Sequence, residues 1–202
     1  MASSPGNPLW SILVSLQTQC MSEKTLKSWQ EEIKRLLQDH HAHDRHGLAL
    51  LTEALSKATD RTQARNELAK KADEARFFYR RWLVAESRHY SAILIGWPPG
   101  HHTPVHDHDG LWGIELVLSG SLHVDEFEII GEIVTPVRAI DLACDSAAIF
   151  EDAAYAHACS NPSMSFPALS LHIYGGSLQS YDVYPHHEVA TRERKSTSTE
   201  TL

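Results

Sequence analysis

The spacing of apolar residues divides the chain into a helical first part and a strand-rich second part. Up to residue 76, apolar residues recur at intervals of three and four, which is the period of an amphipathic helix. Because each segment has one apolar face, we expect the helices to pack against the outside of a sheet. The predicted helices contain Leu9–Leu16, Leu26–Leu37 after an N-cap at Ser22, Leu48–Leu55 and Asp60–Ala75.

From residue 77 onward, short segments rich in β-branched and aromatic residues alternate with turns, which indicates strands. Glycine-containing turns are predicted at 98–100, 119–120 and 175–176. Short strands without intervening helices are typical of an antiparallel barrel or jelly roll, a group that includes the cupins. The predicted strands are Phe78–Val84, Ser91–Trp97, Gly113–Ser119, Ser121–Ile130, Ile133–Ile140, Ser146–Phe150, His157–Ser160 and Ala168–Tyr174.

These patterns predict one structural domain with a mainly β fold, a cupin jelly-roll β-barrel with N-terminal α-helices packed outside. The helical segment spans residues 1–76 and the barrel spans 77–187. Residues 188–202 are polar and rich in Thr, Ser, Arg and Glu, so we expect a flexible C-terminal tail.

Charge and composition exclude several classes of function. The formal net charge of −8 argues against binding to a nucleic-acid backbone. No apolar run reaches the roughly 18 to 20 residues that cross a bilayer, and the first residues lack the features of a secretory signal, so we expect a cytoplasmic protein without a membrane partner. The cysteines Cys20, Cys144 and Cys159 are widely spaced, which favours reduced thiols over a disulfide framework.

Histidine is abundant, with 14 residues, and two of these stand in an HxH pair, His106 and His108. If both lie on one strand, alternation directs both imidazoles to the same face, where they could bind one metal ion. His157, in another predicted strand, is the candidate third ligand. Considered alone, His157 could equally be a buried histidine with a hydrogen-bond partner, but the combined pattern favours a ligand. Imidazole suits iron, zinc, copper or nickel, so the ligands alone do not select the metal.

A second polar group follows in the last strong strand. Alternation directs Ser170, His172 and Tyr174 to one face, where they could form a hydrogen-bonded relay that ends on the phenol. The alternative is an ordinary strand whose polar face meets solvent. The GxSxG turn of serine hydrolases is absent from the sequence.

The histidine pattern resembles the two sequence motifs of the cupins. The glutamate that usually follows HxH is missing, because Trp112 or Gly113 takes its place. Glu115 is nearby but does not have the spacing of the motif, so we interpret it as a group behind the ligands or a structural residue. Three neutral histidines without a carboxylate leave up to three coordination positions open. The matching residues are Gly100, His106, His108, Gly120, His157 and Asn161.

Together, HDH at 106–108, His157 and SLHIY at 170–174 resemble the thiol dioxygenases, the family of cysteine dioxygenase and 3-mercaptopropionate dioxygenase. The resemblance implies Fe(2+) bound by the three histidines. It also implies that Tyr174 stands near the bound substrate or oxygen, oriented by His172 and Ser170.

The resemblance further implies a substrate anchor and a subgroup. Arg81 aligns with the residue that binds the substrate carboxylate, whereas Arg80 should face the other side of the strand. Gly113 aligns with the cysteine that animal cysteine dioxygenases cross-link to the relay tyrosine, so this chain should lack the cross-link, as bacterial members do. The turn at 175–176 resembles that of the 3-mercaptopropionate enzymes, but their downstream arginine has no counterpart before Arg192.

We therefore predict an iron(II)-dependent thiol dioxygenase that oxidises the thiol of a small thiol carboxylate to a sulfinate with O2. Cysteine is the first candidate substrate, and 3-mercaptopropionate and mercaptosuccinate are alternatives. A non-oxygenase metal cupin, such as an isomerase or a small-molecule sensor, is the alternative from another class. The histidine group at 40–43 is interpreted as a solvated helix end.

Overall fold

The computed structural model describes residues 8–41, 44–131, 133–151, 153–184 and 192–202, with only the backbone course for 8–22. The described residues form three helices and two six-stranded sheets. The helices are α1 (Pro8–Asp39), α2 (Arg45–Arg61) and α3 (Arg65–Glu74). The strands are β1 (Arg80–Ser87), β2 (Tyr90–Trp97), β3 (Val105–His106), β4 (Gly113–Ser119), β5 (Ser121–Ile130), β6 (Ile133–Ala143), β7 (Ala147–Phe150), β8 (Tyr155–Ser160), β9 (Ala168–Tyr174), β10 (Ser180–Tyr184), β11 (Glu193–Ser196) and β12 (Glu200–Thr201).

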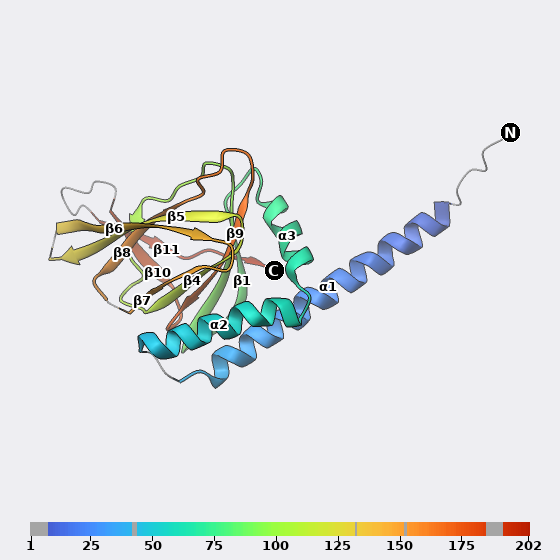
Figure 1. Ribbon diagram of the computed structural model, residues 1–202, viewed down its shortest axis with the longest axis horizontal. Coiled ribbons are helices and arrows are strands. Elements are labelled where there is room, and N and C mark those ends of the chain that lie inside the picture. The colour runs from blue at the N-terminus through green and yellow to red at the C-terminus, as the bar shows by residue number, and fades with distance from the viewer. Residues whose placement is uncertain (1–7, 42–43, 132, 152, 185–191) are drawn as a thin grey trace.

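The two sheets face one another and confirm the predicted jelly roll. One sheet has the order β12-β1-β2-β9-β4-β7, and the other has the order β11-β10-β3-β8-β5-β6. Side chains such as Ile93, Val117 and Val124 fill the space between them. The helices cover the outer face of the first sheet, where Trp29 and Ile33 of α1 are fully buried (Figure 1). The central strands β2 and β9 are therefore buried on both faces, which explains their nearly continuous apolar sequences.

The helix boundaries differ from the prediction in two places. Helix α1 continues through Ser22, so the predicted N-cap there is wrong. Residues 9–39 contain no Gly or Pro to interrupt the helix, and the apolar face continues along its second half. The helix predicted from Asp60 begins instead at Arg65, because Gln63 adopts a φ of 55° after the end of α2. Asp44 caps α2 by accepting a hydrogen bond from the backbone N–H of Gly47 at 2.8 Å.

The C-terminal segment is not a flexible tail along the length that the structure describes. Strand β11 pairs antiparallel with β10, and β12 pairs parallel with β1. Each adds one strand to the edge of a different sheet. Edge positions need backbone hydrogen bonds rather than buried side chains, so polar residues such as those of β11 can fill them. The prediction from composition was wrong for this reason.

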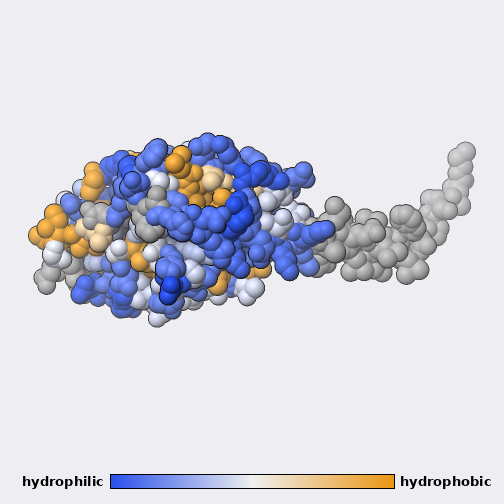
Figure 2. Space-filling view, turned by 90° about the horizontal axis from the view of Figure 1, so that it is seen from below, coloured by the Kyte–Doolittle hydropathy of each residue, from blue (hydrophilic) through white to orange (hydrophobic). Residues whose placement is uncertain are grey.

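The outer surface is largely hydrophilic, with local apolar areas (Figure 2). One of these lies at the end where β5 and β6 meet, and Ile130, Ile133 and Val137 are its exposed apolar residues. Within the described residues, we find no helix with the length and apolar character needed to cross a membrane. Cys144 and Cys159 are free thiols, and the side chain of Cys20 lies outside the described part.

Candidate metal centre and substrate pocket

Three histidines converge inside the barrel. One comes from β3, one from the neighbouring strand β8, and one from the turn that follows β3. His106 on β3 is opposite His157 on β8, and their Nε2 atoms lie 3.3 Å apart. His108 completes the group, with ring centroids 5.4 Å from His106 and 4.7 Å from His157. One nitrogen of each residue lies within 4.8 Å of the others, which is a spacing that a single metal ion can bridge. These are the three histidines that the sequence analysis singled out as candidate ligands, and the structure brings them together.

The sequence argument placed both imidazoles on one face if His106 and His108 share a strand, but strand β3 ends at His106, so that condition is not met. The intervening Asp107 is responsible for the change of direction. Its carboxylate accepts hydrogen bonds from the backbone N–H of Asp182 at 2.9 Å and from the hydroxyl of Tyr184 at 2.9 Å. Asp107 therefore fixes the segment to β10, and His108 reaches the interior from a turn rather than from a strand.

The protonation of the histidines and the lack of other partners fit a metal site. Burial, aided by neighbouring His157, lowers the pKa of His106 to about 3, so its ring is neutral with a free lone pair at neutral pH. Burial also holds the pKa of His108 well below its usual value. Both ring nitrogens of His108 are buried and have no hydrogen-bond partner among the described residues. Buried polar atoms are rarely left unpaired, so a metal ion is the expected partner.

Glu115 lies behind the histidine group and not within it. Its side chain is fully buried, and its Oε1 atom lies 3.2 Å from Nδ1 of His157, on the opposite side of that ring from the nitrogen that faces His106. A carboxylate in this position orients a ligand histidine without occupying a coordination position. The group of three histidines therefore contains no carboxylate, while Glu115 lies in a second close group with His157 and Cys159.

The side chains of Ser170, His172 and Tyr174 form the predicted chain of contacts along β9. Ser170 Oγ lies 2.8 Å from Nε2 of His172, and the hydroxyl of Tyr174 lies 3.4 Å from Nδ1 of the same ring. Trp97, which the sequence analysis did not include, donates its indole N–H to Ser170 Oγ at 2.8 Å. Burial raises the pKa of Tyr174 well above its usual value, so the phenol is protonated at neutral pH.

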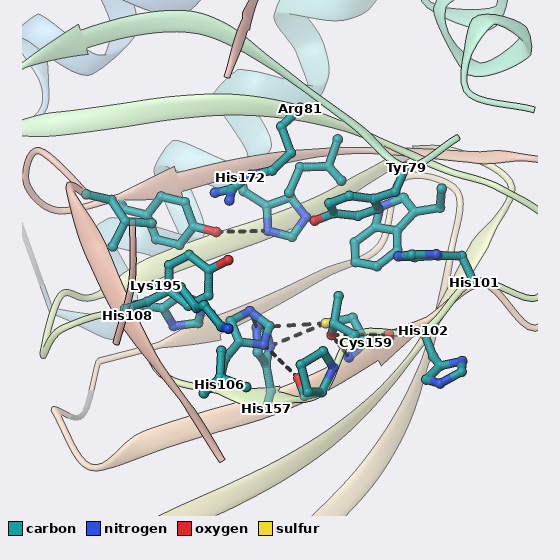
Figure 3. Close-up of a pocket in the computed structure, with 18 residues that line it drawn as sticks. Tyr79, Arg81, His101, His102, His106, His108, His157, Cys159, His172 and Lys195 are labelled. Carbon is teal, nitrogen blue, oxygen red and sulfur yellow. Dashed lines mark hydrogen bonds between the residues drawn. The ribbon is translucent and has the colours of Figure 1, made fainter. Parts of the chain in front are cut away.

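A cavity of about 280 Å³ lies beside the histidines, and Arg81 lines it. Figure 3 shows Arg81 across the pocket from His106 and His157. Arg80 instead pairs with Glu200, with Nε 3.1 Å from Oε1. The two arginines thus lie on different sides of β1, as predicted. Lys195 from β11 also lines the cavity, and sequence reasoning missed it because the strand that carries it was predicted to be disordered.

Gly113, on β4, is a position where the structure leaves no room for a side chain. A Cβ atom there would lie 2.1 Å from Cζ of Phe150 and 2.9 Å from the backbone oxygen of Ile173. The Phe150 ring itself stacks on His108, with centroids 4.6 Å apart, and on Tyr155, with centroids 4.4 Å apart. The space beside the metal ligands is therefore filled by an aromatic ring.

The remaining residues singled out from the sequence lie outside the pocket or at its edge. Asn161 donates its amide N–H groups to the backbone oxygens of Trp97 and Phe166, so its role is to hold two loops together. Of the histidine group at 40–43, His41 is exposed and His40 lies near Trp112, with ring centroids 6.4 Å apart. His43 falls outside the described residues.

Comparison with known protein families gives one match that covers most of the chain. The model of the family described as cysteine dioxygenase type I matches residues 14–186. No curated protein matches the chain.

Several solved structures match about half of the chain at low similarity. A Thermus thermophilus protein is 26% identical over 48% of this chain and 83% of its own, with a TM-score of 0.40. A cupin superfamily protein from Desulfitobacterium hafniense is 17% identical over 50% of this chain and 80% of its own, with a TM-score of 0.41. A Klebsiella pneumoniae protein with a double-stranded β-helix domain is 20% identical over 53% of this chain and 89% of its own, with a TM-score of 0.40.

Proposed function

Because the chain belongs to the cysteine dioxygenase type I family, we propose that it is an iron(II)-dependent dioxygenase of a small thiol carboxylate. The observation that carries this proposal is the convergence of His106, His108 and His157 beside a cavity whose opposite wall carries Arg81. Three neutral ligands suit a divalent cation, and a fixed guanidinium suits a carboxylate.

His106, His108 and His157 would hold the iron. When bound, ferrous iron supplies a Lewis-acidic, redox-active centre at which a thiol and dioxygen react. The overall change converts R–SH and O2 into R–SO2H, and both oxygen atoms end on sulfur. The sulfur gives up four electrons and dioxygen accepts four, so the reaction needs no external reductant.

The other residues of the pocket bind and orient the substrate. Arg81 binds the carboxylate, which leaves the thiol directed toward the three histidines. Tyr174 presents a phenol proton near the reacting atoms, and His172 and Ser170 hold that phenol in position. Ile95 and Leu178 line the same cavity and limit the entry of water.

Cysteine is the first candidate substrate, since it carries one carboxylate for Arg81 and an amine that can act as a further ligand. 3-Mercaptopropionate has the same carboxylate but lacks the amine. Lys195 supports mercaptosuccinate as a second candidate, because a second cation in the same cavity suits a second carboxylate. The amine and the additional carboxylate distinguish these substrates by charge.

Oxygen uptake with a panel of thiols tests the proposal. We expect protein loaded with one equivalent of iron to consume oxygen in the presence of a thiol carboxylate and to form the sulfinate, detected by mass spectrometry. Anaerobic removal of iron should abolish the uptake, and adding iron back should restore it. Purified protein that holds zinc or nickel and never consumes oxygen when loaded with iron would instead indicate a non-oxygenase metal cupin.

A further inference from the structure

One carboxylate oxygen connects the candidate metal centre to the relay on β9. Oε1 of Glu115 lies 3.2 Å from Nδ1 of His157 and 3.3 Å from Nδ1 of His172. Glu115 comes from β4, directly opposite His172 in the sheet, whereas His157 comes from the facing sheet. Oε1 is buried and has no partner with full hydrogen-bond geometry among the described residues, so these two nitrogens are its close polar neighbours by distance. A buried carboxylate oxygen in this position needs N–H donors, and among the described residues these two rings are the donors that lie close to it.

The hydrogen bonds at the other end of the relay have a fixed direction. The indole nitrogen of Trp97 can only donate, so Ser170 Oγ accepts from it. The other side-chain contact of Ser170 that the structure gives is Nε2 of His172, at 2.8 Å. The buried hydroxyl also has a proton that needs an acceptor, and Nε2 of His172 is the side-chain acceptor that the structure gives it. The serine hydroxyl then donates to this nitrogen, which is unprotonated.

The contact with Glu115 and the contact with Ser170 require the same tautomer of His172. A neutral imidazole carries one N–H group, and with Nε2 accepting from Ser170 this group must be at Nδ1. There it faces the carboxylate of Glu115, which is an acceptor only. Nδ1 then cannot accept a proton from Tyr174, whose hydroxyl lies 3.4 Å away. The phenol proton is left free for an acceptor in the cavity.

We propose that Glu115 is a positioning residue that fixes the tautomers of His157 and His172 at the same time. With its N–H at Nδ1, His157 presents the Nε2 lone pair to the metal. With the same tautomer, His172 leaves the hydroxyl proton of Tyr174 directed into the pocket. The statement about Tyr174 rests on the proposed dioxygenase function, whereas the two tautomers do not depend on it.

Nitrogen-15 NMR of histidine-labelled protein measures the tautomers directly. In the zinc-loaded wild-type protein, we expect His172 to carry its proton on Nδ1 and His157 to bind the metal through Nε2. Glu115→Gln offers an amide that can both donate and accept, so His172 should then populate the Nε2–H form as well. Its affinity for Zn(2+) or Fe(2+), measured against a competing chelator, should fall by roughly 10- to 100-fold.

Glu126→Gln is the matched control, because Glu126 is a buried carboxylate on β5 that pairs with Arg138. This variant should keep the wild-type tautomers and metal affinity. A wild-type spectrum with His172 protonated at Nε2 would overturn the inference, and so would a folded Glu115→Gln variant with unchanged tautomers and affinity. The wild-type spectrum shows the direction of the hydrogen bonds in the relay even if Glu115→Gln does not fold. Should the tautomers agree while oxygen uptake is absent, the proposed function fails and this inference stands.

Discussion

The guanidinium of Arg81 lies against the ring of Tyr181, with Cζ 5.8 Å from the ring centre. This cation–π contact holds the side chain at the wall of the cavity. The Nε atom of Arg81 is buried and has no hydrogen-bond partner among the described residues. A buried donor without a partner is directed toward a ligand, and a carboxylate is the ligand that matches a guanidinium in both charge and shape.

The first prediction concerns this donor. Replacing Arg81 with Gln removes the charge and the paired N–H groups, so we expect kcat/KM for cysteine to fall by a factor on the order of 10 to 100, since hydrogen bonds to charged groups contribute about 1.5–3 kcal/mol each. Iron content should not change. Arg80→Gln is the control, because Arg80 pairs with Glu200 and not with the cavity. Equal losses in the two variants would exclude Arg81 as the carboxylate anchor.

Lys195 carries the second prediction, which concerns the choice between thiol acids. Its ammonium pairs with Glu193 at 2.7 Å and is about half exposed, so its contribution to binding is small. Lys195→Gln should lower kcat/KM for mercaptosuccinate about two- to fivefold relative to 3-mercaptopropionate, as measured by oxygen uptake at low salt. Arg194→Gln is the control. The neighbouring Arg194 pairs with Asp109, so replacing it should leave this ratio unchanged. A ratio that does not respond to Lys195 argues against a dicarboxylate substrate.

The sequence predicted those strands and candidate ligands whose side chains form a recognisable pattern along the chain. Alternating apolar residues identify β5, and a nearly continuous apolar run identifies β2, because both bury side chains in the core. Strands β11 and β12 carry no such signal, since backbone hydrogen bonds to an edge hold them in place. Lys195 was missed together with its strand.

Glu115 illustrates the limit of spacing arguments at the site. Its position relative to HxH indicated that it is not a metal ligand. The structure places it outside the group of His106, His108 and His157, although it forms a second close group with His157 and Cys159. Its contact with both His157 and His172 depends on the register between β4 and β9 and on the distance between the two sheets. Neither quantity can be derived from residue spacing along the chain.

The third prediction follows from the protonation of His106. Burial and His157 lower its pKa from 6.5 to about 3 in the folded protein. Between these values the unfolded chain binds a proton that the folded protein does not, so the stabilising effect is complete above pH 6.5 and is lost as the pH falls toward 3. The melting temperature of the metal-free protein should therefore drop between pH 7 and pH 5. His106→Asn cannot titrate, and its melting temperature should fall less steeply over the same range.

Gly113 provides the fourth prediction. This position has no positive φ, so its glycine is required by space rather than by backbone conformation. A Cβ atom would collide with the ring of Phe150, which packs against both His108 and Tyr155. Gly113→Ala should therefore lower the free energy of unfolding by about 1–3 kcal/mol through overpacking, as measured by urea denaturation.

A second substitution separates crowding from other causes of this loss. In a Phe150→Leu background, the cost of Gly113→Ala should shrink, because the ring that meets the new methyl group is gone, although the contact with the backbone oxygen of Ile173 remains. Gly131→Ala is the control: its φ of 64° strains any side chain, but nothing lies within 4 Å of the added Cβ, so its cost should not depend on Phe150. If Phe150→Leu fails to reduce the cost at Gly113, the ring is not what excludes a side chain there. Because Gly113 lies opposite Tyr174 in the sheet and carries no thiol, we also expect the intact mass of the protein to match the sequence without a cross-link to that tyrosine.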